Sequence, residues 1–293
     1  MFLTCCYIEY YITTALGRNA NKLVFICMRS SFVVIIKIMK NPQNKDTSWN
    51  KVADWYDELL KNDDSYQAKV ILPNLLRFLG LKKGEQVYDL ACGQGYFANI
   101  FAHEGANVVA SDLSKKLIET AKKDSKEKVL FYITPAHRAQ FLKDNSIDTI
   151  VIVLAIQNIE NVGEVFAECK RVLKNTGRIV LVLNHPAFRV PQGSDWHFEN
   201  GIQSRIIYKY LSESKLSIDM TPGEKNIKKK ISTITFHRSL QYYMKLFSKN
   251  GFAITRLEEW ISHKQSQTGP RQIAEDKARK EIPMFMCIEV KKI

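Results

Sequence analysis

The stretch YDLACGQGYFA at residues 88–98 decides how this sequence is interpreted. Two glycines, Gly93 and Gly95, follow a short apolar run, and an acid, Asp89, stands four residues before the first of them. Glycine has no Cβ, so a ligand can approach its backbone and the residue can adopt dihedral angles that others avoid. Doubly wound sheets bind ligands at a strand end of this kind. The stretch therefore predicts a ligand site after the first strand of a sheet.

Apolar strands and amphipathic helices alternate on both sides of this turn. We expect strands at 86–91, 107–112, 129–134, 147–155 and 177–184. We expect helices at 49–60, 68–80, 96–105, 114–127 and 162–177. Ser114 is the expected N-cap of one of them. This alternation predicts a parallel sheet that is covered by helices on both faces.

The alternation stops after residue 184. Residues 185–235 are polar and contain three prolines, so we interpret them as an insertion. Beyond it we expect a helix at 240–251, an exposed charged helix at 271–283, and strands at 252–260 and 283–292. The two strands can pair as an antiparallel C-terminal hairpin at one sheet edge. The expected fold class is α/β, with a doubly wound, seven-stranded, mostly parallel sheet.

Composition indicates an ordinary globular chain whose charge is unevenly distributed. The 293 residues are 45% hydrophobic and 25% charged, with a net charge of +13. Residues 41–184 carry +1, whereas residues 185–293 carry +8. A basic surplus favours anionic partners, RNA among them, although a solvated surface is the commoner explanation. The six cysteines include no CxxC pair and no zinc-like spacing, which indicates a reducing, cytoplasmic location and no metal site.

Residues 1–40 differ in character from the rest of the chain. The apolar stretch 22–39 is interrupted by Arg29 and Lys37, and its uninterrupted pieces are too short to cross a bilayer. We favour an atypical extension that is foreign to the native protein, with Met39 as the natural start. A weak membrane anchor and a packed helix are the alternatives, and no stable membrane insertion is expected. The main domain is then expected at residues 41–293.

The acid before the glycines distinguishes two classes of cofactor. A nicotinamide-binding turn has a third glycine, or an alanine, three residues after the second, and Ala98 occupies that place. Asp112, at the end of the second strand, suits a ribose diol in either class. The carboxylate of Asp89 is unfavourable beside a pyrophosphate. It suits instead a ligand with a cationic head, such as S-adenosylmethionine with its ammonium and sulfonium groups.

With these motifs the chain resembles the class I S-adenosylmethionine-dependent methyltransferases. The first motif of that family is an acid, two residues, a small residue and Gly-x-Gly, which matches DLACGQG at 89–95. The acid that ends its second strand matches Asp112, and its fourth strand matches NSIDTIVIVLA at 145–155. Residues 237–260 resemble the last helix and strand of small-molecule members, such as the quinone-biosynthesis methyltransferases. The resemblance covers roughly residues 49–292.

The resemblance implies a Rossmann-like fold and S-adenosylmethionine as the cofactor. It places the cofactor on Tyr56, Asp89, Ala91, Cys92, Gly93, Gly95, Asp112, Leu113, Ala136, His137, Leu154 and Ala155. Many members hold the adenine with an acid after strand three, but this chain has Pro135 there. We therefore expect the adenine against the backbone N–H of Ala136, with a contact from His137. Tyr56 is expected in a helix that closes over the methionine end, with a core position as the alternative.

Several polar residues are candidates for the acceptor side. His185 follows the fifth strand, and His237 and Arg238 precede the last helix. Histidine has a pKa near the working pH and suits a general base, although each of these histidines also has a structural interpretation as a turn or cap residue. Gln157 and Asn158 follow strand four, where the methyl acceptor lies in relatives. We treat both amides and Arg238 as candidate substrate-binding residues.

The expected function is in-line transfer of a methyl group to a small organic acceptor. Positioning of the reactants can supply about 7–11 kcal/mol of the barrier in such a reaction. An RNA methyltransferase is the alternative that the basic C-terminal third supports, although the sequence shows no RNA-binding module, no NPPY-type motif and no suitably placed catalytic cysteine. A cofactor-binding protein without turnover and a nicotinamide oxidoreductase are further alternatives. The acceptor, the methylated atom and the oligomeric state stay open.

Overall fold

The computed structural model describes residues 24–29, 32–37, 48–220 and 232–293. They belong to two units, Met1–Lys45 and Asp46–Ile293. The first unit contains an antiparallel hairpin of β1 (Val24–Arg29) and β2 (Phe32–Lys37), so its described residues are not the packed helix considered above. The other residues of this unit lie outside the described part. Its interpretation as a foreign extension stays a prediction.

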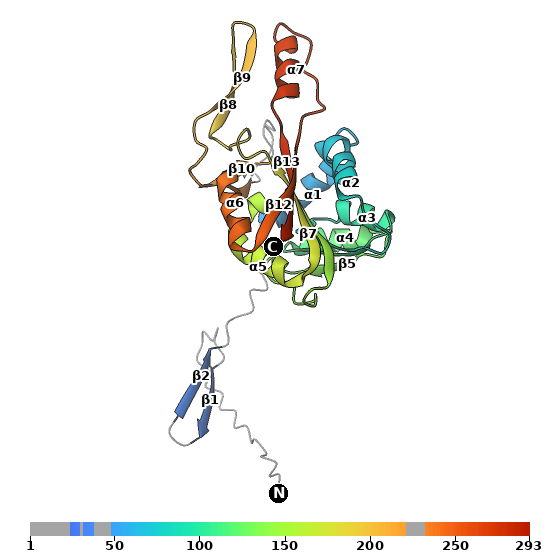
Figure 1. Ribbon diagram of the computed structural model, residues 1–293, viewed down its shortest axis with the longest axis vertical. Helices are drawn as coiled ribbons and strands as arrows, with labels where there is room; N and C mark the ends of the chain where they lie inside the picture. Colours follow the sequence, from blue (N-terminus) through green and yellow to red (C-terminus); the bar gives the residue numbers. More distant parts are fainter. Residues whose placement is uncertain (1–23, 30–31, 38–47, 221–231) are drawn as a thin grey trace. The chain divides into compact units, whose positions relative to one another are not determined.

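A seven-stranded sheet forms the centre of the second unit (Figure 1). Its strands are β3 (Gln86–Leu90), β4 (Asn107–Asp112), β5 (Leu130–Ile133), β6 (Ile147–Val153), β7 (Leu173–Asn184), β12 (Phe252–Trp260) and β13 (Phe285–Lys292). They lie in the order β12-β13-β7-β6-β3-β4-β5. Strands β3 to β7 pair in parallel, whereas β13 runs antiparallel to both β7 and β12. The expected α/β fold class is confirmed, and the order reverses at β3, where such sheets bind ligands.

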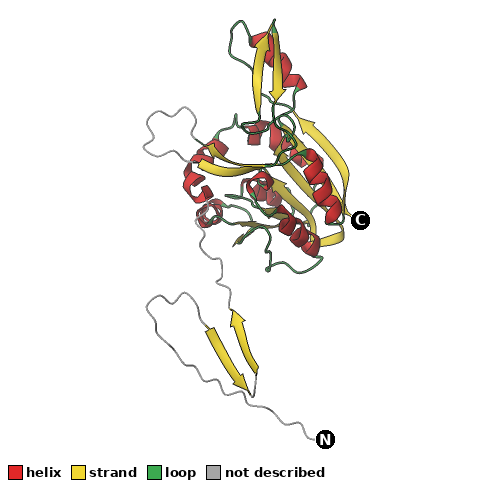
Figure 2. Ribbon diagram, turned by 90° about the vertical axis from the view of Figure 1, so that its left-hand side faces the viewer, coloured by secondary structure: helices red, strands yellow, loops and turns green. Residues whose placement is uncertain are grey.

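Helices cover both faces of the sheet (Figure 2). Successive residues of a strand pack on opposite faces of the sheet, in two separate apolar cores. In β3, for example, Tyr88 belongs to one core and Val87 to the other. One core contains α5 (Val162–Val172) and α6 (Leu240–Lys249). The other contains the turn η1 (Gln67–Ile71), α2 (Leu72–Leu79), α3 (Tyr96–His103) and α4 (Lys115–Asp124). Burial on both faces explains why these strands are continuous apolar runs in the sequence.

A local signal accounts for the start of α4. The hydroxyl of Ser114 accepts the N–H of Leu117 at the start of α4, so the predicted cap is confirmed. Two predicted boundaries are wrong, the end of one helix and the start of the strand after it, which was expected at 177–184 and begins at Leu173. The helix expected over 162–177 ends at Val172, because Leu173 already pairs with Ile147 in the sheet. Gly177 lies within β7, where a Cβ would be 2.8 Å from the Leu173 side chain, so this glycine serves strand packing rather than a helix end.

The insertion contains two β-hairpins that the sequence analysis did not predict. β8 (Ser194–Glu199) pairs with β9 (Ile202–Ile207), and β10 (Ser214–Asp219) pairs with β11 (Ser232–His237). Asn200 and Gly201 join β8 to β9, and both have positive φ. An Asn-Gly pair favours this tight hairpin turn, so the sequence did contain a signal for it. The helix α7 (Gln272–Glu281), expected at 271–283, contacts β9 and stands beside this hairpin (Figure 1).

Candidate functional site

The turn after β3 is held in a conformation that favours glycine. Ala91, Gly93 and Gly95 have φ values of 60°, 58° and 77°. A Cβ at Gly95 would lie 2.7 Å from the side chain of Phe131, which packs in the core, so a larger residue does not fit there. Gly95 leads directly into α3, and the first N–H groups of a helix have no partners within it. The turn therefore offers backbone donors at the point where the strand order reverses.

Asp112 connects the end of β4 to this turn. Its Oδ2 accepts the N–H of Gly93 at 3.0 Å, and its Oδ1 accepts the N–H of Ser114 at 2.8 Å. Burial raises the pKa of Asp112, and hydrogen bonds from the backbone of Ser114, Gly93 and Leu113 oppose that rise. A carboxylate has about four lone-pair positions, so Asp112 can still accept hydrogen bonds from a ligand. The side chain of Leu113 is exposed beside it.

Asp89 is buried at the end of β3, with 2% of its surface exposed. Its Oδ2 has no hydrogen-bond partner among the described residues. Burial and the nearby charge of Asp112 raise the pKa of Asp89 to about 7. A hydrogen bond from the backbone of Ala98 opposes this rise. A buried carboxylate oxygen without a partner is unfavourable, and a positively charged ligand group would offset that cost. The pair of acids therefore fits a ligand that combines a cationic centre with hydroxyl groups.

Helix α1 (Ser48–Lys61) is joined to both loops that carry these acids. The Asp57 carboxylate accepts from Gln94 Nε2 at 2.9 Å, and Asn50 Oδ1 accepts from the Ser114 hydroxyl at 2.5 Å. Both contacts lie beside the glycine turn. Tyr56 belongs to this helix, but its side chain lies outside the described part of the structure. Its role as a lid over the cofactor stays a prediction.

The remaining cofactor candidates stand in different surroundings. Cys92 is half-buried, and burial together with the charges of Asp89 and Asp112 raises the pKa of its thiol, so the thiol stays protonated. Ala136 and His137 follow β5, where His137 is exposed and its Nε2 lies 3.8 Å from Glu164 Oε2. An adenine site on these two residues stays a prediction.

The turn after β6 carries two amide side chains with different surroundings. Leu154 has a φ of 51°, and its carbonyl accepts Gln157 Nε2 at 2.9 Å and Asn158 Nδ2 at 3.2 Å. Ala155 follows it and precedes the single turn η2 (Ile156–Asn158). The Oε1 atom of Gln157 is buried and has no partner among the described residues. Of the two candidate amides, Gln157 thus has an acceptor atom available for a ligand.

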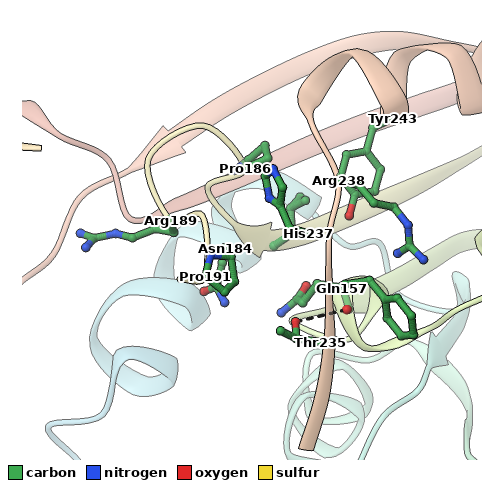
Figure 3. A pocket seen from close by; sticks show the side chains of 11 residues that line it. Gln157, Asn184, Pro186, Arg189, Pro191, Thr235, His237, Arg238 and Tyr243 are labelled. Carbon is green, nitrogen blue, oxygen red and sulfur yellow. Dashed lines mark hydrogen bonds between the residues drawn. The ribbon is translucent and has the colours of Figure 1, made fainter. Parts of the chain in front are cut away.

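A pocket lies where β7, β11 and the turn after β6 meet (Figure 3). Its lining residues are Gln157, Leu183, Asn184, Pro186, Arg189, Pro191, Thr235, Phe236, His237, Arg238 and Tyr243. The Thr235 hydroxyl donates to the Gln157 carbonyl at 3.3 Å, which joins β11 to the turn after β6. The pocket thus contains three predicted residues, Gln157, His237 and Arg238, whereas Asn158 and His185 are not among its lining residues.

The sequence analysis missed Asn184 and Arg189 as lining residues of this pocket. Asn184 is the exposed last residue of β7. Its place at the carboxyl end of a parallel strand was a usable signal, because ligands bind beyond these ends. Arg189 stands in a turn of the insertion, where no motif marks it.

The histidine after β7 is engaged within the protein through both ring nitrogens. His185 is 4% exposed, and its Nε2 lies 2.6 Å from Glu259 Oε1. Its Nδ1 accepts the N–H groups of Ala187 at 3.2 Å and Phe188 at 3.3 Å. Burial lowers the pKa of His185, and Glu259 opposes that change. These contacts connect the turn after β7 to β12 and leave no ring nitrogen free for a ligand.

His237 has one ring nitrogen available. Its Nε2 lies 2.7 Å from the carbonyl oxygen of Tyr210. A carbonyl only accepts hydrogen bonds, so Nε2 carries the hydrogen, and Nδ1 is the nitrogen with a lone pair when the ring is neutral. His237 lines the pocket, and the carbonyl of Tyr210 fixes its neutral ring in the tautomer with the hydrogen on Nε2. This arrangement suits a general base.

Arg238 is buried and donates mainly to backbone carbonyls. Its Nη2 lies 2.8 Å from the carbonyl oxygens of both Ile159 and Glu160, and its guanidinium carbon lies 4.9 Å from the ring centroid of Phe236. These contacts hold the turn after β6 against β11. The guanidinium therefore shapes the pocket, and direct substrate binding by Arg238 stays a prediction.

The described residues contain no group of three or more His, Cys, Asp or Glu that could hold a metal ion. The ligand chemistry of the site is that of Asp89, Asp112, the glycine turn and the polar atoms of the pocket.

The chain is similar to known proteins in part of its sequence and in its fold. Residues 88–181 match the family described as "Methyltransferase domain". The chain is 26% identical over 171 residues to an uncharacterized protein of Haemophilus influenzae, covering 55% of this chain and 67% of that protein. It is 26% identical over 213 residues to a demethylmenaquinone methyltransferase of Thermobifida fusca, covering 68% of this chain and 89% of that protein. A crystal structure of an S-adenosylmethionine-dependent methyltransferase from Mesorhizobium loti matches the fold with a TM-score of 0.58 and 24% identity, over 75% of this chain and 96% of that one.

Proposed function

Because the chain belongs to the class I S-adenosylmethionine-dependent methyltransferases, we propose that it methylates a small organic acceptor in the pocket between β7 and β11. The position of this pocket carries the proposal. It lies at the carboxyl ends of β6 and β7, and β6 pairs directly with β3, whose end carries Asp89. Acceptor and cofactor would then lie at neighbouring strand ends of one sheet.

The residues around the glycine turn fit the cofactor. S-adenosylmethionine supplies an electrophilic methyl group on its sulfonium. Asp112 would accept hydrogen bonds from the ribose hydroxyls, and the unpartnered Oδ2 of Asp89 would face the cationic end. The contacts of α1 with Gln94 and Ser114 would exclude water from this side of the cofactor.

The acceptor would be oriented by the polar atoms of the pocket. Gln157 Oε1 would accept a hydrogen bond from a hydroxyl or amine of the acceptor, because it has no partner among the described residues. His237 Nδ1 would take the proton from the acceptor atom as the new bond to carbon forms. A positioned general base contributes typically about 10²–10⁴-fold to a rate. We assign this role to His237 rather than to His185, whose nitrogens are both engaged.

Two further statements from the sequence stay predictions. An RNA acceptor is the alternative supported by the net charge of +8 on residues 185–293, but we favour a small molecule because the candidate acceptor residues Gln157, His237 and Arg238 line one pocket. A cytoplasmic location rests on the cysteine pattern alone. Among the described helices, none combines the length and the apolar character needed to cross a membrane.

Two measurements test the proposed function. Calorimetry should show micromolar binding of S-adenosylmethionine and S-adenosylhomocysteine, with NAD binding much more weakly. Incubation with methyl-labelled cofactor, pooled small metabolites and total RNA should transfer label to a small molecule. Tight NAD binding without S-adenosylhomocysteine binding would exclude the cofactor assignment, and label found only in RNA would favour the alternative acceptor.

A further inference from the structure

An arginine without a counter-charge lies at one end of the acceptor pocket. Arg189 lines the pocket, and in Figure 3 its side chain extends away from Gln157 and Thr235. Its Nε is buried and has no hydrogen-bond partner among the described residues. Burying part of a guanidinium without a partner is unfavourable, so an anionic ligand at this place would stabilise it.

The neighbouring charges add to this cost. Burial lowers the pKa of Arg189, and the positive charges of Arg205 and Arg279 lower it further, while Tyr66 opposes them. Arg205 has Asp195 as an acidic neighbour and donates to the carbonyl of Phe188 at 2.9 Å, so its charge is partly compensated. Arg189 has no such compensation. Among the described residues, none of the three arginines forms an ion pair with a carboxylate within 4.0 Å.

The fold holds two of these guanidinium groups against one aromatic side chain. The guanidinium carbons of Arg189 and Arg205 lie 5.4 Å and 5.2 Å from the ring centroid of Trp196 in β8. Contact with a ring face leaves the N–H groups at the edge of the Arg189 guanidinium for a planar or tetrahedral anion. Arg205 already donates to the Phe188 carbonyl and the Ser194 hydroxyl, so it contributes mainly its charge. Arg279 reaches the same region from α7, where its Nε donates to the Ser266 hydroxyl at 3.2 Å. Three separate elements of the basic C-terminal third thus contribute charge to one end of the pocket.

We propose that Arg189, supported by Arg205 and Arg279, binds an anionic group of the methyl acceptor, a carboxylate or a phosphate. This inference rests on the proposed function. The anion would lie at the Arg189 end of the pocket, and the atom that is methylated would lie near Gln157 and His237 at the other. Arginine binds carboxylate and phosphate oxygens through strong charge-assisted hydrogen bonds. The acceptor is therefore a small organic acid or phosphate ester rather than a neutral molecule.

Matched pairs of ligands test the inference on the full chain with S-adenosylhomocysteine bound. The probes are small carboxylates with their amides, beginning with 4-hydroxybenzoate and 4-hydroxybenzamide, and phosphate monoesters with their parent alcohols. Calorimetry should show binding of at least one anionic member that is about tenfold or more tighter than binding of its neutral partner. The Arg189→Gln variant should reduce that ratio to near one, and Arg189→Lys should restore part of it.

Control measurements separate this inference from the proposed function. Lys245→Gln removes the same charge at an exposed position of α6 and should leave the ligand ratio unchanged. Thermal melting shows whether Arg189→Gln is folded, and its S-adenosylhomocysteine affinity should equal that of the unchanged protein. If the cofactor binds and methyl transfer occurs, but no anionic ligand is preferred or the preference survives Arg189→Gln, this inference alone is wrong. Failure to bind S-adenosylhomocysteine would instead count against the proposed function. If Arg189→Gln weakens the binding of an RNA oligonucleotide but of no small anion, the three arginines bind RNA phosphates and this inference is wrong.

Discussion

The cofactor side and the acceptor side of this site are assembled in different ways. On the cofactor side, Asp89, Gly93 and Asp112 are close in sequence and end two neighbouring parallel strands. On the acceptor side, the pocket joins Gln157 after β6 to Thr235 in β11, across the whole insertion. Residues that end adjacent strands can be recognised from their spacing. A pocket assembled through an insertion depends on hairpins whose placement no local pattern specifies.

The two sides also differ in charge. The cofactor side contains the buried Asp89 and the partly buried Asp112, and Asp89 has an oxygen without a partner among the described residues. The acceptor side contains Arg189, whose Nε is likewise buried without a partner. A cationic cofactor and an anionic acceptor would each offset the cost of one of these groups. Variants on the two sides should therefore separate cofactor affinity from acceptor affinity and turnover.

The largest expected effect is loss of cofactor binding when the glycine turn is altered. Gly93→Val should abolish measurable S-adenosylhomocysteine binding, because a β-branched residue is strained at a φ of 58° and its side chain enters the proposed ligand space. Gly84→Val is the matched control, since Gly84 has a φ of 82° with no atom within 4 Å of an added Cβ. It should lose stability but keep its affinity in calorimetry. If Gly93→Val binds S-adenosylhomocysteine normally, the glycine turn is not the cofactor site.

The next effect belongs to the acceptor side. His237→Ala should lower kcat by about 10²–10⁴-fold through loss of the general base, with the affinity for S-adenosylhomocysteine nearly unchanged. His185→Ala is the matched comparison. It should lower the melting temperature, because Glu259 loses its partner, while the pH dependence of kcat is retained. If His185→Ala removes the pH dependence and His237→Ala does not, the base assignments are reversed.

A smaller effect is expected on the cofactor side from Asp112→Ala. The cofactor affinity should fall by about 1.5–3 kcal/mol, the loss usual for a hydrogen bond to a charged group. Some loss of stability should accompany it, because the N–H groups of Gly93 and Ser114 lose their acceptor. Asp124→Ala, at the exposed end of α4, is the control and should leave the affinity unchanged. An unchanged affinity in Asp112→Ala would show that the ribose lies elsewhere.

The smallest effect is a dependence of cofactor affinity on pH. Burial and Asp112 raise the pKa of Asp89 from 3.8 to about 7, so ionisation of this group lowers folding stability as pH rises between these values. A cationic ligand needs the ionised carboxylate. Affinity for S-adenosylmethionine should therefore increase with pH up to about 7, by at most about tenfold per pH unit, and then level off.

Calorimetry between pH 5.5 and 8.5 measures this dependence. Asp89→Asn should bind more weakly with a flat profile, and at pH 8 the ligand-free variant should melt at a higher temperature than the unchanged protein. A flat profile in the unchanged protein would show that Asp89 does not face the cationic end of the cofactor.

The sequence by itself determined the sheet and the cofactor side of this protein. The strands of the main sheet lie close to their expected ranges, except that β7 begins at Leu173 rather than at residue 177. The central strands could be recognised because strands that are buried on both faces are largely apolar. The glycine turn could also be recognised, since left-handed φ values favour glycine and a Cβ at Gly95 would collide with Phe131. These signals are local, so spacing along the chain was sufficient.

Only the tertiary structure decided the acceptor side. It engages both nitrogens of His185 through Glu259 and the turn after β7, and it leaves one nitrogen of His237 available. It directs Arg238 to carbonyl groups and places Arg189 near Arg205, whose acidic neighbour is Asp195, while Arg189 has no acidic neighbour among the described residues. Sequence spacing could not distinguish these histidines or these arginines, because the role of each depends on hydrogen bonds and charges from residues far away in the chain.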